Sequence, residues 1–333
     1  MTAYDGPWVE AADPVSPSLR VVALGGGHGL AANLSALRTF VSDLTAIVTV
    51  ADNGGSSGRL RSELGVLPPG DLRQALAALC GDDEWGRTWA RVLQHRFESA
   101  GELHRHAVGN LLIVALWELL DGHVEGLDWV GRLLGAQGRV LPMTAVPLDI
   151  VAQVRGGDPA QPGDLTTIRG QVEVASTTGL VESVQLVPAD PPACTEAVEA
   201  IHAADWVILG PGSWYTSVLP HLLVPELQTA LTKSSARRCV TLNLAPQPGE
   251  TEGFSASTYL EVLAVHAPDL QVDVVLADPS GIGDVDMLEE TVNGLGAELV
   301  IADVAAHDLE ARHDVARLAR AYASIMGVAV EGS

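Results

Sequence analysis

The chain has 333 residues, of which 47% are hydrophobic and 18% are charged, a composition typical of a globular protein with a sizeable core. Its formal net charge of −23 argues against nucleic acid and anionic membrane surfaces as partners, because both would repel it. Three widely separated cysteines indicate neither a zinc site nor a disulfide framework. Residues 1–18 are acidic and interrupted by prolines, so we expect a disordered tail, no secretory signal, no membrane insertion and a cytoplasmic location.

The predicted elements, in chain order, are those of an α/β protein. The apolar run 19–24 ends at glycines, and with the following helix and the strand 44–50 it forms a βαβ unit. Residues 71–137 are predicted to be mostly helical, and 140–188 to form a small β-rich insertion. Further strands are predicted, separated by helices, at 206–209, 239–244, 272–276 and 299–302, before a last helix over about 313–326. We therefore predict a single domain over 19–330 with a Rossmann-like, mostly parallel sheet and helices on both faces.

The first glycine-rich loop lies directly after the first strand and opens a helix. In that position bare backbone amides and the helix dipole bind phosphate. The strict dinucleotide pattern G-x-G-x-x-G is incomplete, because Leu30 occupies the place of the third glycine. A tight turn without a ligand is the alternative. The predicted ligand residues of this loop are Gly25, Gly26, Gly27, His28 and Gly29.

The second loop follows the second strand, at the edge of the sheet where ligands collect in α/β proteins. Its acidic residue is placed to meet ribose hydroxyls, and its serines and arginine suit phosphate oxygens. The alternatives are a solvated loop and, for the arginine, a surface ion pair with Glu63. Nearby, Asp71 is expected to cap the helix that it begins. The predicted ligand residues here are Asp52, Asn53, Gly54, Gly55, Ser56, Ser57 and Arg59.

The third loop again follows a strand and precedes a helix, and it contributes Gly210, Gly212 and Ser213. The serine is expected to cap the helix or to face a phosphate. Asn243 ends the next strand, so three strand ends predict one shared pocket. The chain contains no G-x-S-x-G, H-E-x-x-H or kinase motif, and we predict no catalytic residue.

At these loops the chain resembles the YvcK/CofD-like family, and more closely its YvcK branch, whose members are called gluconeogenesis factors. Asn110 and Arg312 lie in the matching segments and complete the predicted ligand residues. The matching segments are GGGHGL (25–30), TAIVTVADNGGSSGRLRSELGVLPPGDLRQAL (45–76), HAVGNLLIVAL (106–116), LGPGSWYTSVLP (209–220), NLAPQPGETEGFSAS (243–257) and RHDVARLA (312–319).

The resemblance implies a cytoplasmic protein that binds a UDP-sugar such as UDP-N-acetylglucosamine and regulates cell shape, peptidoglycan synthesis and gluconeogenic growth. It implies no required cofactor and no established catalytic activity. Cell-wall or morphogenesis proteins and a second copy of the chain are the expected protein partners.

Two other functions are alternatives to this one. The CofD branch implies a phospholactate transferase with a guanosine diphosphate donor and magnesium, for which Asp52 and Asp71 are the candidate ligands. The segment ADNGGSSGRLR replaces the shorter acidic segment of that branch, and His28 stands where many relatives carry threonine. The third candidate, an NAD-dependent oxidoreductase, is disfavoured by the incomplete glycine pattern.

Overall fold

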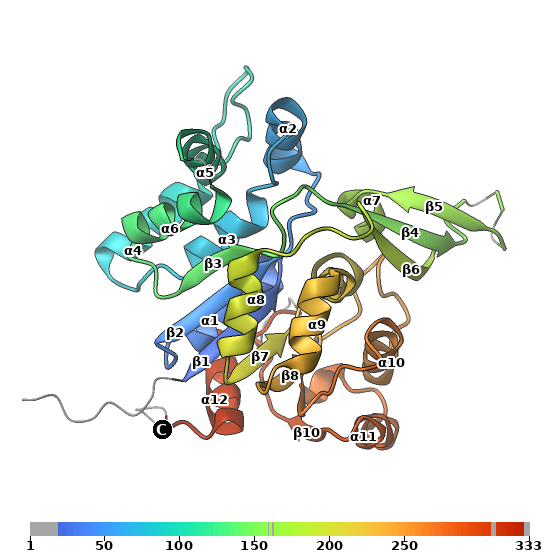
Figure 1. Ribbon diagram of the computed structural model, residues 1–333. Helices are drawn as coiled ribbons and strands as arrows, with labels where there is room; N and C mark the ends of the chain where they lie inside the picture. Colours follow the sequence, from blue (N-terminus) through green and yellow to red (C-terminus); the bar gives the residue numbers. More distant parts are fainter. Residues whose placement is uncertain (1–18, 121, 159, 162, 308–310, 330–333) are drawn as a thin grey trace, which may run out of the picture.

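The computed structural model describes residues 19–120, 122–158, 160–161, 163–307 and 311–329, so the predicted tail 1–18 lies outside the described residues (Figure 1). Its main sheet has seven parallel strands, in agreement with the predicted Rossmann-like fold. Their order is β3–β2–β1–β7–β8–β9–β10, with bounds β1 (Arg20–Gly25), β2 (Asp43–Val48), β3 (Arg139–Pro142), β7 (Trp206–Leu209), β8 (Arg237–Thr241), β9 (Val274–Ala277) and β10 (Glu298–Ile301).

Helices cover both faces of this sheet. On one face α1 (Gly27–Leu37) packs against α3 (Gly70–Ala78) and α12 (Val315–Met326), while α8 (Thr195–Ala203) and α9 (Pro225–Lys233) pack together on the other (Figure 1). The later crossovers contain η1 (Trp214–Val218), η2 (Leu219–Leu223), α10 (Ala256–His266), η3 (Pro279–Gly281) and α11 (Val285–Gly294). None of the helices in the described ranges has the length and apolar character needed to cross a membrane.

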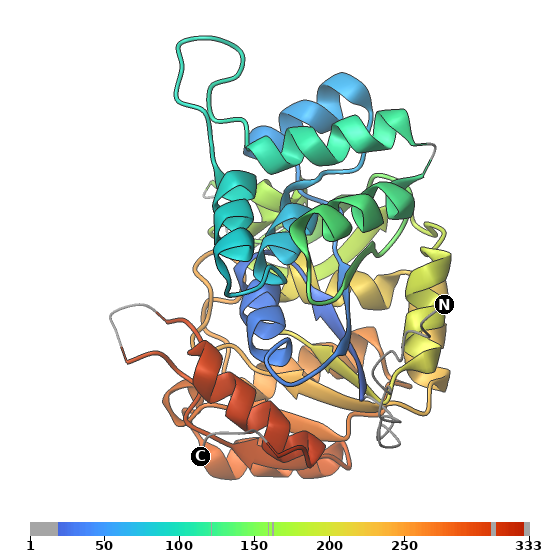
Figure 2. The ribbon, with the colours of Figure 1, turned by 90° about the vertical axis from the view of Figure 1, so that its left-hand side faces the viewer.

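The predicted helical stretch forms a group beyond the edge strand β3. Within the predicted range 71–137 it contains α3, α4 (Glu84–Gln94), α5 (Val108–Leu119) and α6 (His123–Leu134). The helix α2 (Gly55–Leu64) joins this group but was not predicted, because its first residues were assigned to the second loop. The segment 95–107 between α4 and α5 projects away from this group as a long loop (Figure 2).

The predicted β-rich insertion is a three-stranded antiparallel sheet that extends to one side of the molecule (Figure 1). Its order is β5–β4–β6, and it contains β4 (Asp149–Arg155), β5 (Leu165–Arg169), α7 (Gln171–Ala175) and β6 (Leu180–Val187). Residues 140–142 were wrongly assigned to it, because they belong to β3, which pairs in parallel with β2. The strand ends in Pro142, and prolines in this part of the chain made it resemble the start of the insertion.

The order of the strands places a topological switch point between β1 and β7. From β1 the chain adds β2 and β3 on one side, and from β7 it adds β8, β9 and β10 on the other. β1 and β7 are themselves paired in parallel, with Leu24 opposite Leu209. In such sheets ligands bind in the crevice outside the carboxyl ends of the strands at the switch point. The first and third loops border that crevice.

Candidate functional site

A cavity of about 520 Å³ lies at the switch point. This volume falls within the usual range for sites that bind small molecules and cofactors. The ends of β1, β7 and β8 contribute to its wall, and the segment before α12 closes it. The second loop, also predicted as a ligand loop, does not line it. The predicted ligand residues among its lining are His28, Gly29, Gly212, Asn243 and Arg312. We call it the switch-point cavity.

The first loop presents the amino terminus of α1 to this cavity. The helix begins at Gly27, and its N-cap residue, Gly26, makes no side-chain capping bond. The amides of the first turn have no acceptor within the helix itself, and the dipole makes this end partly positive. His28 and Gly29, both in the first turn, line the cavity. The amide of Gly27 already donates to Asp71, and a phosphate at the first turn stays a prediction.

The first and third loops touch backbone to backbone. A Cβ atom added to Gly29 would lie only 2.7 Å from the Cα atom of Gly212 and still closer to the carbonyl oxygen of Pro211. The buried Asn33 of α1 connects this helix to the third loop by donating to the carbonyl of Gly210. Its side-chain oxygen accepts a bond from the Tyr322 hydroxyl at 2.6 Å. The cavity is thus built on a fixed backbone contact between α1 and the end of β7.

Two predicted ligand residues, Asn243 and Ser213, form hydrogen bonds within the protein at the third loop. Asn243 accepts from the amide of Gly212 at 2.8 Å and donates to its carbonyl at 2.9 Å. Ser213 is at the N-cap position of η1, but its side chain makes no capping bond. Its hydroxyl interacts with the buried Glu250, which accepts the amide of Thr216 at 2.8 Å.

Glu250 is a site residue that sequence reasoning missed. Burial raises the pKa of this carboxyl group above its usual value, against the effect of the hydrogen bonds from Thr216 and Ser213. The carboxylate occupies the amino terminus of η1, where we expected a phosphate. The segment NLAPQPGETEGF, which contains Glu250, was the only signal for it in the sequence.

The serines of the second loop lie in a separate polar cluster. Asn110 donates to Ser56 at 3.1 Å and to Ser57 at 3.4 Å, and it accepts from Arg73 at 2.8 Å. Ser56 also lies 3.0 Å from Nδ1 of His106. The cluster joins the amino termini of α2 and α5, and none of these residues lines the switch-point cavity.

Two other predicted residues of the second loop contact distant parts of the chain. The Asn53 side chain forms two hydrogen bonds with α7. Its amide nitrogen donates to Glu173 (2.7 Å), and its oxygen accepts from the Val172 amide (3.1 Å). Arg59 donates to the carbonyls of Glu102 (3.2 Å) and His104 (2.7 Å) in the projecting loop. A contact between Arg59 and a phosphate stays a prediction.

The two candidate metal ligands are Asp52, in the second loop, and Asp71, in the first turn of α3. Asp52 accepts the amide of Gly54 at 2.8 Å, at the amino end of α2. The expected capping role of Asp71 is wrong, because Pro69 is the N-cap of α3 and no side chain caps that helix. Asp71 instead faces the first loop, where a Cβ atom on Gly26 would lie 2.6 Å from its carboxylate oxygen.

Asp71 is 9% exposed, and burial raises the pKa of its carboxyl group to about 7, with the charge of Asp52 acting in the same direction. In the described part of the chain, no group of three or more His, Cys, Asp or Glu residues could hold a metal ion. Magnesium is commonly bound by one or two carboxylates and the phosphates of a substrate. Asp52 and Asp71 fit that requirement only if the ligand itself supplies oxygen atoms.

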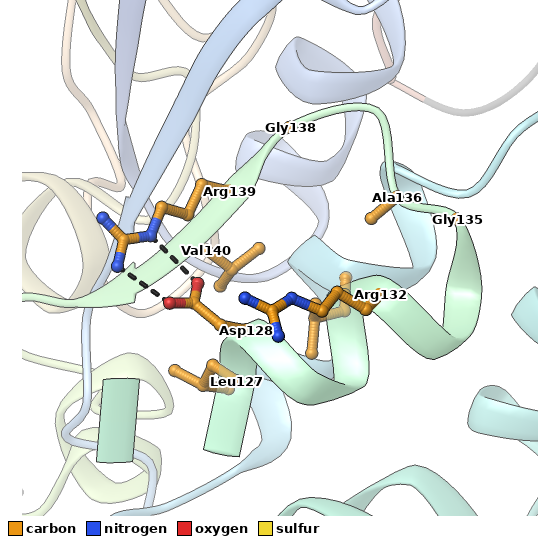
Figure 3. A pocket seen from close by; sticks show the side chains of 10 residues that line it. Leu127, Asp128, Arg132, Gly135, Ala136, Gly138, Arg139 and Val140 are labelled. Atoms are coloured by element: carbon orange, nitrogen blue, oxygen red, sulfur yellow. Dashed lines mark hydrogen bonds and ion pairs between the residues drawn. The ribbon is translucent and has the colours of Figure 1, made fainter. Parts of the chain in front are cut away.

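A second hollow, of about 380 Å³, lies at the opposite end of the sheet, beside the first residue of β3 (Figure 3). Arg139 donates to both carboxylate oxygens of Asp128, at 2.9 and 2.8 Å, and this pairing raises the pKa of the guanidinium. Arg132 lies over the ring of Trp129, 5.2 Å from its centroid. Since the charge of Arg139 is already paired, we assign no ligand to this hollow.

Comparison with protein-family models and with known proteins shows extensive similarity. The model of 2-phospho-L-lactate transferase CofD matches residues 21–318. A protein of Mycobacterium leprae described as "Putative gluconeogenesis factor" is 53% identical over 311 residues, which are 92% of this chain and 86% of the relative. A "Gluconeogenesis factor" of Halalkalibacterium halodurans is 38% identical over 264 residues, which are 79% of each chain.

The fold is also found in a solved structure. The crystal structure of a member of the UPF0052 family from Bacillus halodurans superposes with a TM-score of 0.81 at 33% sequence identity. The match covers 92% of this chain and 99% of that chain. The main sheet, its helices and the small antiparallel sheet are therefore shared architecture.

Proposed function

Because the chain belongs to the CofD family, in the branch of the gluconeogenesis factors, we propose that it binds a nucleotide sugar in the switch-point cavity. The proposed ligand is a UDP-sugar such as UDP-N-acetylglucosamine. The proposed role is regulatory and non-catalytic: the occupied protein adjusts peptidoglycan synthesis and cell shape to growth on gluconeogenic carbon. Cell-wall or morphogenesis proteins would receive this signal in the cytoplasm.

The observation that carries the proposal is the convergence of the α1 amino terminus and Arg312 on one cavity at the switch point. A diphosphate placed there would accept amides from the first turn of α1 and a charge-assisted bond from a guanidinium. The apolar and proline-rich wall 244–248 offers a surface for a base or a sugar ring. Among the residues that line the cavity, none is a nucleophile with a neighbouring base, which favours binding over catalysis.

The substitution Arg312→Ala is expected to weaken binding of UDP-N-acetylglucosamine about ten- to a hundredfold, the effect of losing one charge-assisted hydrogen bond. Isothermal titration calorimetry measures this change. Arg320→Ala is the matched control, because Arg320 is exposed on α12 and does not line the cavity. Equal affinities of the two variants would remove Arg312 from the binding site.

A phospholactate transferase is the second candidate, favoured by the proximity of Asp52 and Asp71. In that case these carboxylates would hold magnesium together with the donor's phosphates, and the metal would supply charge stabilisation to the transferred phosphoryl group. Transfer from a guanosine diphosphate donor that depends on Asp52 would favour this candidate over the first.

A further inference from the structure

Arg73 is a buried arginine whose guanidinium is largely without partners. The residue is 2% exposed, and its Nε atom donates to the Asn110 side chain at 2.8 Å. Its Nη1 atom is buried and has no acceptor among the described residues. The other strongly buried arginine, Arg238, donates to the carbonyls of Leu231 (2.8 Å) and Ser234 (2.6 Å). An unsatisfied buried guanidinium is costly, so the missing acceptor of Nη1 needs an explanation.

The guanidinium stays charged at neutral pH. Burial lowers the pKa of Arg73 to about 10, and the charge of Arg96 acts in the same direction. The carboxylates of Asp71 and Asp52 oppose this shift, yet in the part of the chain that the structure describes neither forms an ion pair with Arg73 within 4 Å. The positive charge of Arg73 is therefore left without an ion-pair partner among the described residues.

Two helix amino termini meet at this guanidinium. The hydrogen bond to Asn110 places it at the first turn of α5, and Asn110 in turn bonds to Ser56 and Ser57 in the first turn of α2. The N-cap residues of these helices, Gly54 and Ala107, offer no capping side chain, and their own amides donate to Asp52 (2.8 Å) and Ser56 (3.3 Å). Both helix dipoles thus add to the charge of Arg73 at the same point.

We propose that Arg73 is the centre of a phosphoryl-binding site, built with the amino termini of α2 and α5 and separate in its residues from the switch-point cavity. The forked guanidinium suits two oxygen atoms of a phosphoryl group, and the Ser57 hydroxyl, which in the described residues only accepts a bond from Asn110, can donate to it. The group comes either from the nucleotide sugar or from a second phosphorylated ligand. The site does not depend on the proposed nucleotide-sugar function.

Inorganic phosphate and sulfate are the probes that test this site, titrated into the full chain by calorimetry. We expect both to bind, and Arg73→Gln to reduce their affinity at least about tenfold. Arg73→Lys keeps the positive charge but loses the forked geometry, so its affinity for both anions is expected to lie between those of the wild type and Arg73→Gln. The control Arg91→Gln removes an exposed arginine of α4 and is expected to bind like the wild type.

Stability separates a ligand-binding role from a structural one. Since Nη1 has no protein acceptor, Arg73→Gln is expected to unfold at the same denaturant concentration as the wild type or at a higher one. Failure of the wild type to bind either anion would overturn the proposal. Equal anion binding by Arg73→Gln and Arg91→Gln would also overturn it. The same holds if Arg73→Gln is strongly destabilised while Arg73→Lys binds the anions like the wild type.

Competition identifies the source of the phosphoryl group. Displacement of phosphate by UDP-N-acetylglucosamine would assign the diphosphate of the nucleotide to the Arg73 site in place of the switch-point cavity, and simultaneous binding would assign the Arg73 site to a second ligand. Both outcomes support the Arg73 site. If phosphate binds and UDP-N-acetylglucosamine does not, the nucleotide-sugar proposal fails while the Arg73 site stands.

Discussion

Gly29→Ala is expected to abolish measurable binding of UDP-N-acetylglucosamine and to destabilise the fold. The new methyl group would lie 2.7 Å from the Cα atom of Gly212, so the first and third loops must separate. Neither loop can move freely, because Asn33 holds the carbonyl of Gly210 and Asn243 holds Gly212. Overpacking of this kind costs about 1–3 kcal/mol, and a displacement near 1 Å weakens a positioned site about a hundredfold. Calorimetric titration and thermal unfolding measure the two effects.

The matched control is Gly294→Ala. This glycine is the last residue of α11, and a Cβ atom there would meet nothing within 4 Å. We expect unchanged binding and equal or slightly higher stability, since alanine is the better helix former. Wild-type affinity in Gly29→Ala would mean that the contact between the two loops does not shape the binding site.

Asp71→Asn is expected to stabilise the protein strongly at pH 8 and only slightly at pH 4. Burial raises the pKa of Asp71 from 3.8 to about 7, so the folded protein binds a proton more tightly than the unfolded chain does. Stability from this group is fully present below pH 4, and it is lost as the pH rises to about 7. A shift of this size corresponds to at most about 4 kcal/mol, which asparagine, always neutral, would restore.

Urea unfolding of the variant and the wild type at both pH values measures the difference. Asp286→Asn is the control, because Asp286 is exposed on α11 and its substitution should change stability little at either pH. A stabilisation by Asp71→Asn that is equal at pH 4 and pH 8 would contradict the assignment of a buried, proton-binding carboxyl group.

The fold could be predicted because local signals coincide with the elements. Apolar runs of four to seven residues that stop at glycine or at a polar residue marked β1, β2 and β7 to β10, within a few residues of their bounds. The edge strand β3 escaped because Pro142 and its neighbours resembled the start of the insertion. Its place is fixed by pairing with β2, about 90 residues earlier, which no local pattern reports.

The site was predicted in part. Glycine loops after strands located the switch-point cavity, because the carboxyl ends of parallel strands share one edge. Partners far apart in sequence could not be predicted: Asn53 meets Glu173 of the insertion, and Arg59 meets the carbonyls of the projecting loop. Glu250 escaped for a related reason, since its importance lies in its burial, which only the packed structure provides.

The most direct test of the central proposal compares UDP-N-acetylglucosamine with uridine in calorimetric titrations of the wild-type protein. The contacts proposed for the diphosphate are the amides of the first turn of α1 and the Arg312 guanidinium, so removal of the phosphates should remove most of the binding free energy. We expect UDP-N-acetylglucosamine to bind at least about a hundredfold more tightly than uridine, a difference of about 2.7 kcal/mol. Equal affinity for the two ligands would contradict the assignment of the switch-point cavity as a nucleotide-diphosphate site.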